Sequence, residues 1–192
     1  MAVKKYERVK EFVSAMLDSF SGSAVRFSLM SFGESTRLHY SFNDGLSTDD
    51  LKGVVNGISP TSGESRVDVP LRDVVNVMFS DQNAGKRTNV PRVLVFLTSG
   101  RARFDPGLLS RSSSGLRAAN IQSFVTVVGE GLEKDIQQVV TDNSDMFPLT
   151  TYGELSLIVT PMAQHISRRI TSKYHAVFIL FYHVRLLIGP RL

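Results

Sequence analysis

Residues 93–100 read Val-Leu-Val-Phe-Leu-Thr-Ser-Gly, an apolar run that ends in two hydroxyl side chains and a glycine. A continuous apolar run of this kind predicts a strand of a parallel sheet that is covered on both faces. In open α/β sheets, ligands bind at the carboxyl ends of such strands. We therefore expect Thr98, Ser99 and Gly100 to mark a site position, either one that holds a ligand or one that has lost it.

The rest of the chain alternates between helical and strand patterns around this run. Helical patterns cover about residues 4–20, 47–58, 70–78, 132–140 and 154–169, with a further short helix ending at 116–119. Strand patterns cover residues 25–32, 36–42, 121–128 and 146–149. This alternation predicts an α/β, Rossmann-like fold with an open, mostly parallel sheet and helices on both faces. The hairpin of residues 25–32 and 36–42 adds one antiparallel edge strand.

Composition narrows the class of protein. The chain has 192 residues, of which 42% are hydrophobic and 21% charged, so it can bury the core of one globular domain. It has no cysteine, which excludes disulfides and thiolate metal sites. The first twenty residues are charged and amphipathic, so this sequence contains no signal peptide pattern.

The distribution of charge along the chain indicates which kinds of partner it can bind. The net charge of +4 comes from the end of the chain, because no acid follows Glu154 and five basic residues do: Arg168, Arg169, Lys173, Arg185 and Arg191. No basic face interleaved with aromatic residues occurs in the body, so we expect no nucleic-acid binding. The apolar stretch 176–188 is interrupted by His183 and Arg185 and is shorter than the ~20 residues of a membrane span.

Signals for catalysis or cofactor binding are weak. The histidines at 39, 165, 175 and 183 are not spaced as metal ligands. Residues 111–115, Arg-Ser-Ser-Ser-Gly, predict a loop and helix cap and lack the G-x-S-x-G pattern of a hydrolase nucleophile. The turn Gly129-Glu130-Gly131 follows a strand, as in dinucleotide-binding folds, but Lys134 stands at the third glycine position. We expect a tight turn there and keep a nucleotide-binding domain as the alternative function.

Several short strings, in this order along the chain, resemble a von Willebrand factor type A domain of the collagen or matrilin type. They are residues 6–13, 25–32, 93–100, 116–121, 124–129, Phe147 and 152–155. The resemblance covers about residues 4–169, and residues 1–169 are therefore interpreted as one such domain. It implies a non-enzymatic protein-interaction and adhesion module of the extracellular matrix, with an extracellular location and a protein partner such as collagen.

Domains of that family usually carry a metal-ion-dependent adhesion site. Its pattern is D-x-S-x-S after the first strand, a threonine in a glycine-rich loop and an aspartate after the fourth strand. Aligned with that pattern, this sequence starts at the first helix, so the first strand and its motif are missing. Ser65 stands at the threonine position and Ser99 at the aspartate position. Mg²⁺ prefers anionic oxygen ligands, so we expect a degenerate site, no metal or other cofactor, and metal-independent binding.

The resemblance also implies which residues face the partner. The degenerate metal positions are Ser65, Ser99 and Gly100. The flanking loop residues are Gly63, Glu64, Asp68, Arg101, Asp105 and Glu130.

The segment 170–192 is a basic and apolar tail. The family's missing first strand is central in the strand order 3-2-1-4-5-6, and residues 176–182, Ala-Val-Phe-Ile-Leu-Phe-Tyr, resemble it in character. We hypothesise that they fill the central position in a circularly permuted manner, which would put Phe181, His183 and Arg185 at the motif positions. Two alternatives stay open: the tail begins a second domain, or it is not native sequence. After the interaction module and the nucleotide-binding domain, the third functional hypothesis is a truncated chain without independent function.

Overall fold

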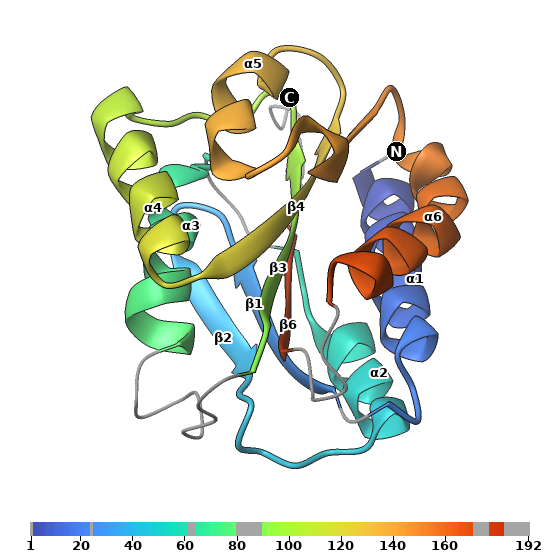
Figure 1. The fold of residues 1–192 in the computed structure, drawn as a ribbon. Helices are drawn as coiled ribbons and strands as arrows, with labels where there is room; N and C mark the ends of the chain where they lie inside the picture. Colours follow the sequence, from blue (N-terminus) through green and yellow to red (C-terminus); the bar gives the residue numbers. More distant parts are fainter. Residues whose placement is uncertain (1, 24, 61–63, 80–89, 171–176, 183–192) are drawn as a thin grey trace.

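The computed structural model describes residues 2–23, 25–60, 64–79, 90–170 and 177–182 (Figure 1). The helices are α1 Ala2–Ser19, α2 Thr48–Gly57, α3 Asp68–Asp73, α4 Pro106–Ala118, α5 Glu133–Ile136 and α6 Leu155–Arg169. The strands are β1 Arg26–Phe32, β2 Thr36–Tyr40, β3 Arg92–Ser99, β4 Ile121–Val128, β5 Met146–Leu149 and β6 Val177–Tyr182. Expected elements and observed elements therefore agree in order over the described residues.

The strands form a single sheet in the order β2-β1-β6-β3-β4-β5. β2 pairs antiparallel with β1, and each of the other neighbouring pairs is parallel. The predicted fold class, an open and mostly parallel sheet with one antiparallel edge strand, is confirmed. β6, the last strand in the chain, lies between β1 and β3. Residues 183 and 185, which the sequence suggested for the motif positions, lie outside the described residues.

Two layers of helices enclose the sheet, as Figure 1 shows: α1, α2 and α6 lie on one side, and α3 and α4 on the other. Each layer packs on its own hydrophobic core. The first core joins α1, α2 and α6 to one face of the strands, and the second joins α3, α4 and α5 to the opposite face. Residues Val93 to Leu97 of β3 are at most 2% exposed. The apolar run that predicted a strand covered on both faces is thus buried as expected.

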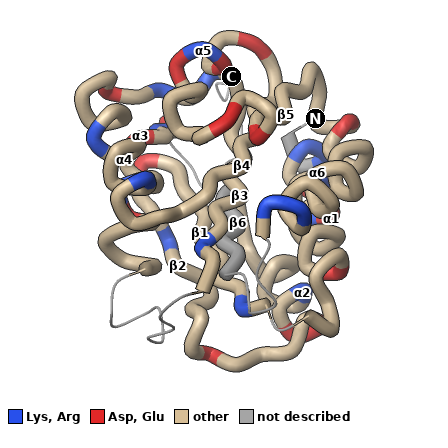
Figure 2. The backbone as a smooth tube through the Cα atoms, in the orientation of Figure 1, with Lys and Arg blue, Asp and Glu red and all other residues tan. Residues whose placement is uncertain are grey.

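Most charged residues lie on the outside of this arrangement, whereas Asp68, Asp73 and Asp145 are buried. Figure 2 shows charged residues on the helices and on the loops around the sheet, whereas β4 carries none over its length.

Two local predictions are wrong. Residues 111–115 lie inside α4, because Asp105 caps the helix by accepting a hydrogen bond from the Leu108 N–H and Pro106 occupies its first turn. The buried hydroxyls that suggested a loop are satisfied within the fold: Ser113 donates to the Leu109 carbonyl.

The helix expected over residues 132–140 is only four residues long and is followed by a 3₁₀ turn, Gln137–Val139. Leu132, Ile136 and Val139 are all buried, as their apolar spacing predicts. Because a short α-helix followed by a 3₁₀ turn buries the same three side chains, the spacing did not determine the length of the helix.

Candidate functional site

Three segments meet at the carboxyl edge of the sheet: residues 64–68, residues 99–105 after β3, and residues 129–131 after β4. We call these the loop face. The Arg103 N–H donates to the Ser65 carbonyl at 2.7 Å, and the Val67 N–H donates to the Arg103 carbonyl at 3.0 Å. A further bond, from the Arg66 N–H to the Gly33 carbonyl at 3.4 Å, ties the first segment to the end of β1. The loop face is therefore fixed by backbone hydrogen bonds rather than by side chains alone.

Gly100 packs directly against the turn after β4. Its N–H donates to the Val128 carbonyl at 2.9 Å, and a Cβ at this position would lie 2.4 Å from the carbonyl oxygens of Gly129 and Glu130. Such a distance is far below van der Waals contact, so only glycine fits here. The contact explains why a glycine follows Ser99 at the end of β3. It also places Glu130 next to Gly100.

Asp68 is the buried anion of the loop face. Its residue is 1% exposed, and its two carboxylate oxygens accept hydrogen bonds from Arg66 Nε at 3.2 Å and Arg66 Nη2 at 2.6 Å. The Asp105 N–H adds a third bond at 3.3 Å. Burial acts to raise the pKa of Asp68, but these hydrogen bonds outweigh it and hold the pKa below its usual value. Asp68 is thus a carboxylate whose charge is already matched by a guanidinium.

The other charges of the loop face are less buried. Glu64 forms an ion pair with Arg103 at 3.0 Å, with both side chains at least half exposed. Asp105 uses its carboxylate to cap α4. Arg101 and Glu130 are exposed. Such pairs add little to stability and leave their charges accessible to a partner.

The two serines at the degenerate metal positions are not joined by any hydrogen bond within the described residues. Ser65 is buried, and its Oγ has no hydrogen-bond partner among the described groups. Ser99 is half-buried, and its carbonyl accepts the Ala102 N–H at 3.1 Å. Gly63 lies outside the described residues. The structure thus brings Glu64, Asp68 and Asp105 together around arginines, and it places Ser99 and Gly100 beside Glu130.

Sequence reasoning missed the two arginines that organise these acids, Arg66 and Arg103. A signal was present, because an arginine stands two residues before an aspartate in both segments, Arg66-Val67-Asp68 and Arg103-Phe104-Asp105. The two arginines are paired across an isolated parallel bridge between the segments. The repeated spacing therefore marks the two loop segments that meet at this bridge.

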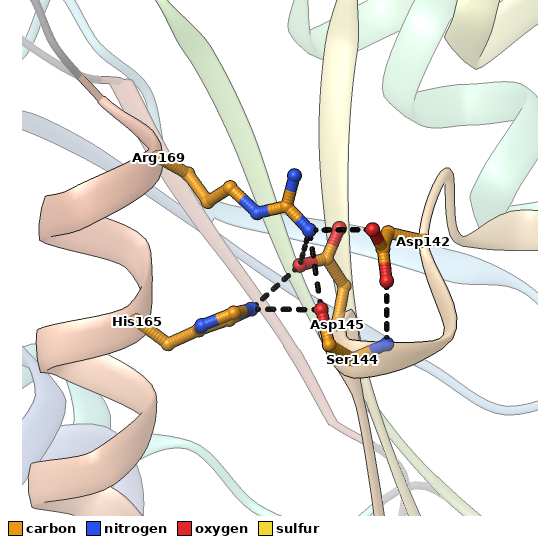
Figure 3. Close-up of polar contacts among 5 residues, drawn as sticks. All are labelled: Asp142, Ser144, Asp145, His165 and Arg169. Atoms are coloured by element: carbon orange, nitrogen blue, oxygen red, sulfur yellow. Dashed lines mark hydrogen bonds and ion pairs between the residues drawn. The ribbon is translucent and has the colours of Figure 1, made fainter.

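A second polar cluster, also missed, joins α6 to the turn before β5 (Figure 3). Asp145 is fully buried, and its Oδ1 lies 2.8 Å from His165 Nε2 and 3.4 Å from Arg169 Nη2. Arg169 also pairs with Asp142 at 3.0 Å. Hydrogen bonds from Ser144 and from Arg169 lower the pKa of Asp142 to about 2. We call these residues, with Ser144, the α6 cluster.

The α6 cluster resembles a Ser-His-Asp triad in composition but not in geometry. Ser144 Oγ and Asp145 Oδ1 both approach the same nitrogen, His165 Nε2, at 3.5 and 2.8 Å. A catalytic histidine needs its two ring nitrogens to face the nucleophile and the carboxylate separately. The His165 ring instead packs edge-on against Phe124 and Phe147. This arrangement fixes α6 to β5 and provides no proton relay.

The remaining candidate was the turn at Gly129–Gly131. The Gly129 N–H donates to the Leu149 carbonyl at 2.8 Å, and Gly131 packs so closely on Gly100 that a Cβ would lie 2.9 Å from its carbonyl oxygen. The helix that follows has only four residues. Both glycines adopt positive φ, which makes the tight turn that the sequence predicted. The turn is used in packing loops together, and nothing in its geometry favours a phosphate.

Metal-binding clusters and membrane-spanning helices are both absent from the described part of the chain. No cluster of three or more His, Asp or Glu side chains suited to a metal ion occurs there. None of its helices combines the length and the apolar character needed to cross a membrane.

The family model of the von Willebrand factor type A domain matches residues 1–161. Among curated proteins, integrin alpha-M of Mus musculus is 33% identical over 101 residues, covering 53% of this chain and 9% of the integrin. Matrilin-2 of Mus musculus is 25% identical over 162 residues, covering 80% of this chain and 17% of matrilin-2. The chain therefore spans a small part of the curated relatives it matches.

Among solved structures, proximal thread matrix protein 1 from the mussel byssus superposes with a TM-score of 0.76 at 18% identity, over 83% of this chain and 42% of that one. Another structure of that mussel protein, with a TM-score of 0.77, has zinc in its metal-ion-dependent adhesion site. At such identities the superpositions establish the shared fold.

Proposed function

The chain belongs to the von Willebrand factor type A domain family, and we propose that it is a protein-interaction module that binds a partner through the loop face without a divalent cation. Its relatives include integrin and matrilin chains and, more distantly, a collagen VI chain. Their nature supports a role in adhesion and an extracellular location. We propose an extracellular matrix protein as the partner, with collagen as the first candidate.

The observation that carries the metal-independent part of the proposal is the ion pair between Arg66 and Asp68. A metal-ion-dependent adhesion site needs anionic oxygens that are free to bind the ion. On the loop face, Asp68 is the buried carboxylate, and Arg66 already contacts both of its oxygens. The hydroxyls of Ser65 and Ser99 are neutral, and that of Ser65 has no hydrogen-bond partner within the described part of the chain. These residues do not fit Mg²⁺, because a cation would have to displace a guanidinium from a carboxylate that it contacts through two bonds.

We propose a binding role and not a catalytic one. In the α6 cluster, the Ser144 hydroxyl and the Asp145 carboxylate compete for a single nitrogen of His165, which argues against a catalytic triad there. The alternative of a nucleotide-binding domain gains no support from the packed turn at Gly129–Gly131. A thermal-shift screen of the full chain with ATP and NAD tests that alternative directly, since a ligand that binds only the folded state raises Tm.

The binding experiment uses the full chain passed over immobilised triple-helical collagen, in buffer with Mg²⁺ and in buffer with EDTA. We expect equal affinity in both. Arg101→Glu, on the loop face, should weaken binding by about tenfold, which corresponds to ~1.4 kcal/mol. Arg168→Glu, which changes another exposed arginine, on α6, is the matched control and should leave the affinity unchanged. Loss of binding in EDTA with recovery in Mg²⁺ would contradict metal independence, and equal effects of the two variants would contradict the assignment of the face.

A further inference from the structure

The position of β6 in the sheet is unusual for a strand at the end of the chain. β6 is the last strand in sequence, yet it is bordered on both sides, by β1 and by β3. Both pairings are parallel and extend over its whole length of six residues. Among the described residues, the other five strands come from residues 26–149, and β6 completes the centre of the sheet from a position after α6 in the chain.

The gap that β6 fills is one strand wide and matched in register on both sides. Ile179 is paired with Ser28 on β1 and with Leu94 on β3, and Tyr182 is paired with Ser31 and Leu97. Residues Arg26 to Ser31 and Arg92 to Leu97 therefore form two parallel walls of equal length. A single extended segment is the only backbone conformation that can satisfy the hydrogen-bonding groups of both walls.

Hydrophobic cores cover the gap on both faces. Leu29 of β1 and Val95 of β3 belong to the core under α1 and α6, while Met30 and Phe96 belong to the core under α3 and α4. On that second face, the rings of Phe32 and Phe96 stack at 5.3 Å although their strands are separated by β6. An empty gap would leave two rows of buried, unpaired backbone groups beneath these cores, which is costly.

We propose that the gap between β1 and β3 is a strand-binding site, and that residues 177–182 occupy it as a ligand carried on the same chain. The site accepts an extended apolar segment in parallel orientation, a form of strand addition to which both edges contribute. Because the ligand is tethered, its effective concentration favours binding within one molecule over binding between molecules. This inference does not depend on the proposed function.

Occupation of the site has a consequence for the loop face. β6 joins β1, which ends near Gly33, to β3, which ends at Ser99. Residues 65–67 form hydrogen bonds to both sides, to Gly33 and to Arg103. Residues 65–67 thus connect the ends of two strands between which β6 lies.

The test introduces pairs of cysteines into the full chain, which has none of its own. In Ser28→Cys/Ile179→Cys and Leu94→Cys/Ile179→Cys, each pair joins residues that are partners across β6. Neighbouring strands lie ~4.8 Å apart, within the range that a disulfide can span. In Ser28→Cys/Leu180→Cys, the matched control, the second cysteine is shifted by one residue and points to the opposite face of the sheet.

We expect both registered pairs to form disulfides within a monomer on mild oxidation, seen by mass spectrometry and by non-reducing gel electrophoresis, and the shifted pair to remain reduced. Oxidation should also raise Tm relative to the same variant under reducing conditions. Disulfide-linked dimers from the registered pairs would show that a second copy supplies the strand and would overturn the proposal. Equal oxidation of all three pairs, or of none, would also overturn it, as expected if residues 177–182 instead began a separate domain.

Discussion

Asp68 and Asp145 are both buried aspartates paired with arginine, but the two carboxylates are satisfied differently. On the loop face, both oxygens of Asp68 accept hydrogen bonds, from Arg66 and from the Asp105 N–H. In the α6 cluster, His165 and Arg169 both approach Oδ1 of Asp145, and Oδ2 has no partner among the described groups. The two sites therefore contain similar residues, but they differ in how many carboxylate oxygens accept a hydrogen bond.

This difference indicates what each site can do. A carboxylate with both oxygens bound to one guanidinium has its charge already matched and fewer lone pairs free for an incoming cation, and it fixes the loop that carries it. The Asp145 carboxylate contacts α6 through one oxygen only, so it holds that helix less firmly than a fully hydrogen-bonded carboxylate would. We infer that the loop face is rigid and closed to metal ions, whereas the contact between α6 and β5 is the weaker of the two.

The largest expected effect concerns the packing of the loop face. In Gly100→Ala, the new methyl group would meet two backbone carbonyl oxygens at 2.4 Å, so the turn after β4 must move. We expect a loss of about 3 kcal/mol in the free energy of unfolding, the upper end of the cost of overpacking. Urea denaturation measures it. Gly53→Ala, in α2 with open space around it, is the control and should gain up to ~1 kcal/mol.

The next effect separates the two partners of the loop-face ion pair. Arg66→Leu leaves the Asp68 carboxylate buried without its cation, whereas Asp68→Asn removes the buried charge and loses ~1–2 kcal/mol of hydrogen bonding. We expect Arg66→Leu to lower Tm further than Asp68→Asn, and the double variant to resemble Asp68→Asn. Thermal unfolding followed by circular dichroism distinguishes these outcomes. Equal and additive losses would mean that the two residues act independently.

A smaller effect is expected at the α6 cluster. Asp145→Asn keeps the shape of the side chain and removes a carboxylate that uses only one oxygen, so we expect a loss of ~1 kcal/mol in the free energy of unfolding. The same substitution at residue 68 should cost more. A greater loss at Asp145 than at Asp68 would reverse the comparison between the two sites.

The smallest effect is the dependence of stability on acid pH. The pKa values of Asp68 and Asp142 are lowered in the folded chain, to about 2 for Asp142, against ~3.9 in an unfolded chain. The unfolded state therefore binds protons first as pH falls, and the stabilisation present above pH ~4 is lost below it. We expect Tm to fall over this range, and less steeply in Asp68→Asn. An identical slope in that variant would contradict the role of Asp68.

The sequence predicted the elements whose pattern is local. The run 93–97 is a buried strand because it is apolar at every position, and Ser47 caps α2 because its hydroxyl accepts the Asp50 N–H. The serines at 112–114 led to a wrong prediction of a loop. Nothing in the local sequence indicates that Ser112 donates a hydrogen bond to the Asp68 carbonyl, 44 residues away. Local patterns therefore describe the scaffold better than the contacts between its parts.

The candidate site was only partly predictable for the same reason. The resemblance to the family placed Ser65, Ser99 and Gly100 at the carboxyl edge of the sheet, where they lie. Arg66 and Arg103 stand at no position of the family's metal pattern, and their importance comes from pairing with Asp68 and Glu64 once the loops meet. An ion pair across loops has no sequence period, so it could not be read from spacing alone.

The central claim is that the loop face needs no divalent cation because Arg66 already neutralises Asp68. Isothermal titration of Mg²⁺ and Mn²⁺ into the metal-free full chain, together with Tm measured in EDTA and in excess Mg²⁺, tests it most directly. A ligand that binds only the folded state at 100 times its dissociation constant adds ~2.7 kcal/mol to stability. We predict no saturable heat and an unchanged Tm. Saturable binding of either ion, abolished by Asp68→Asn, would contradict the account.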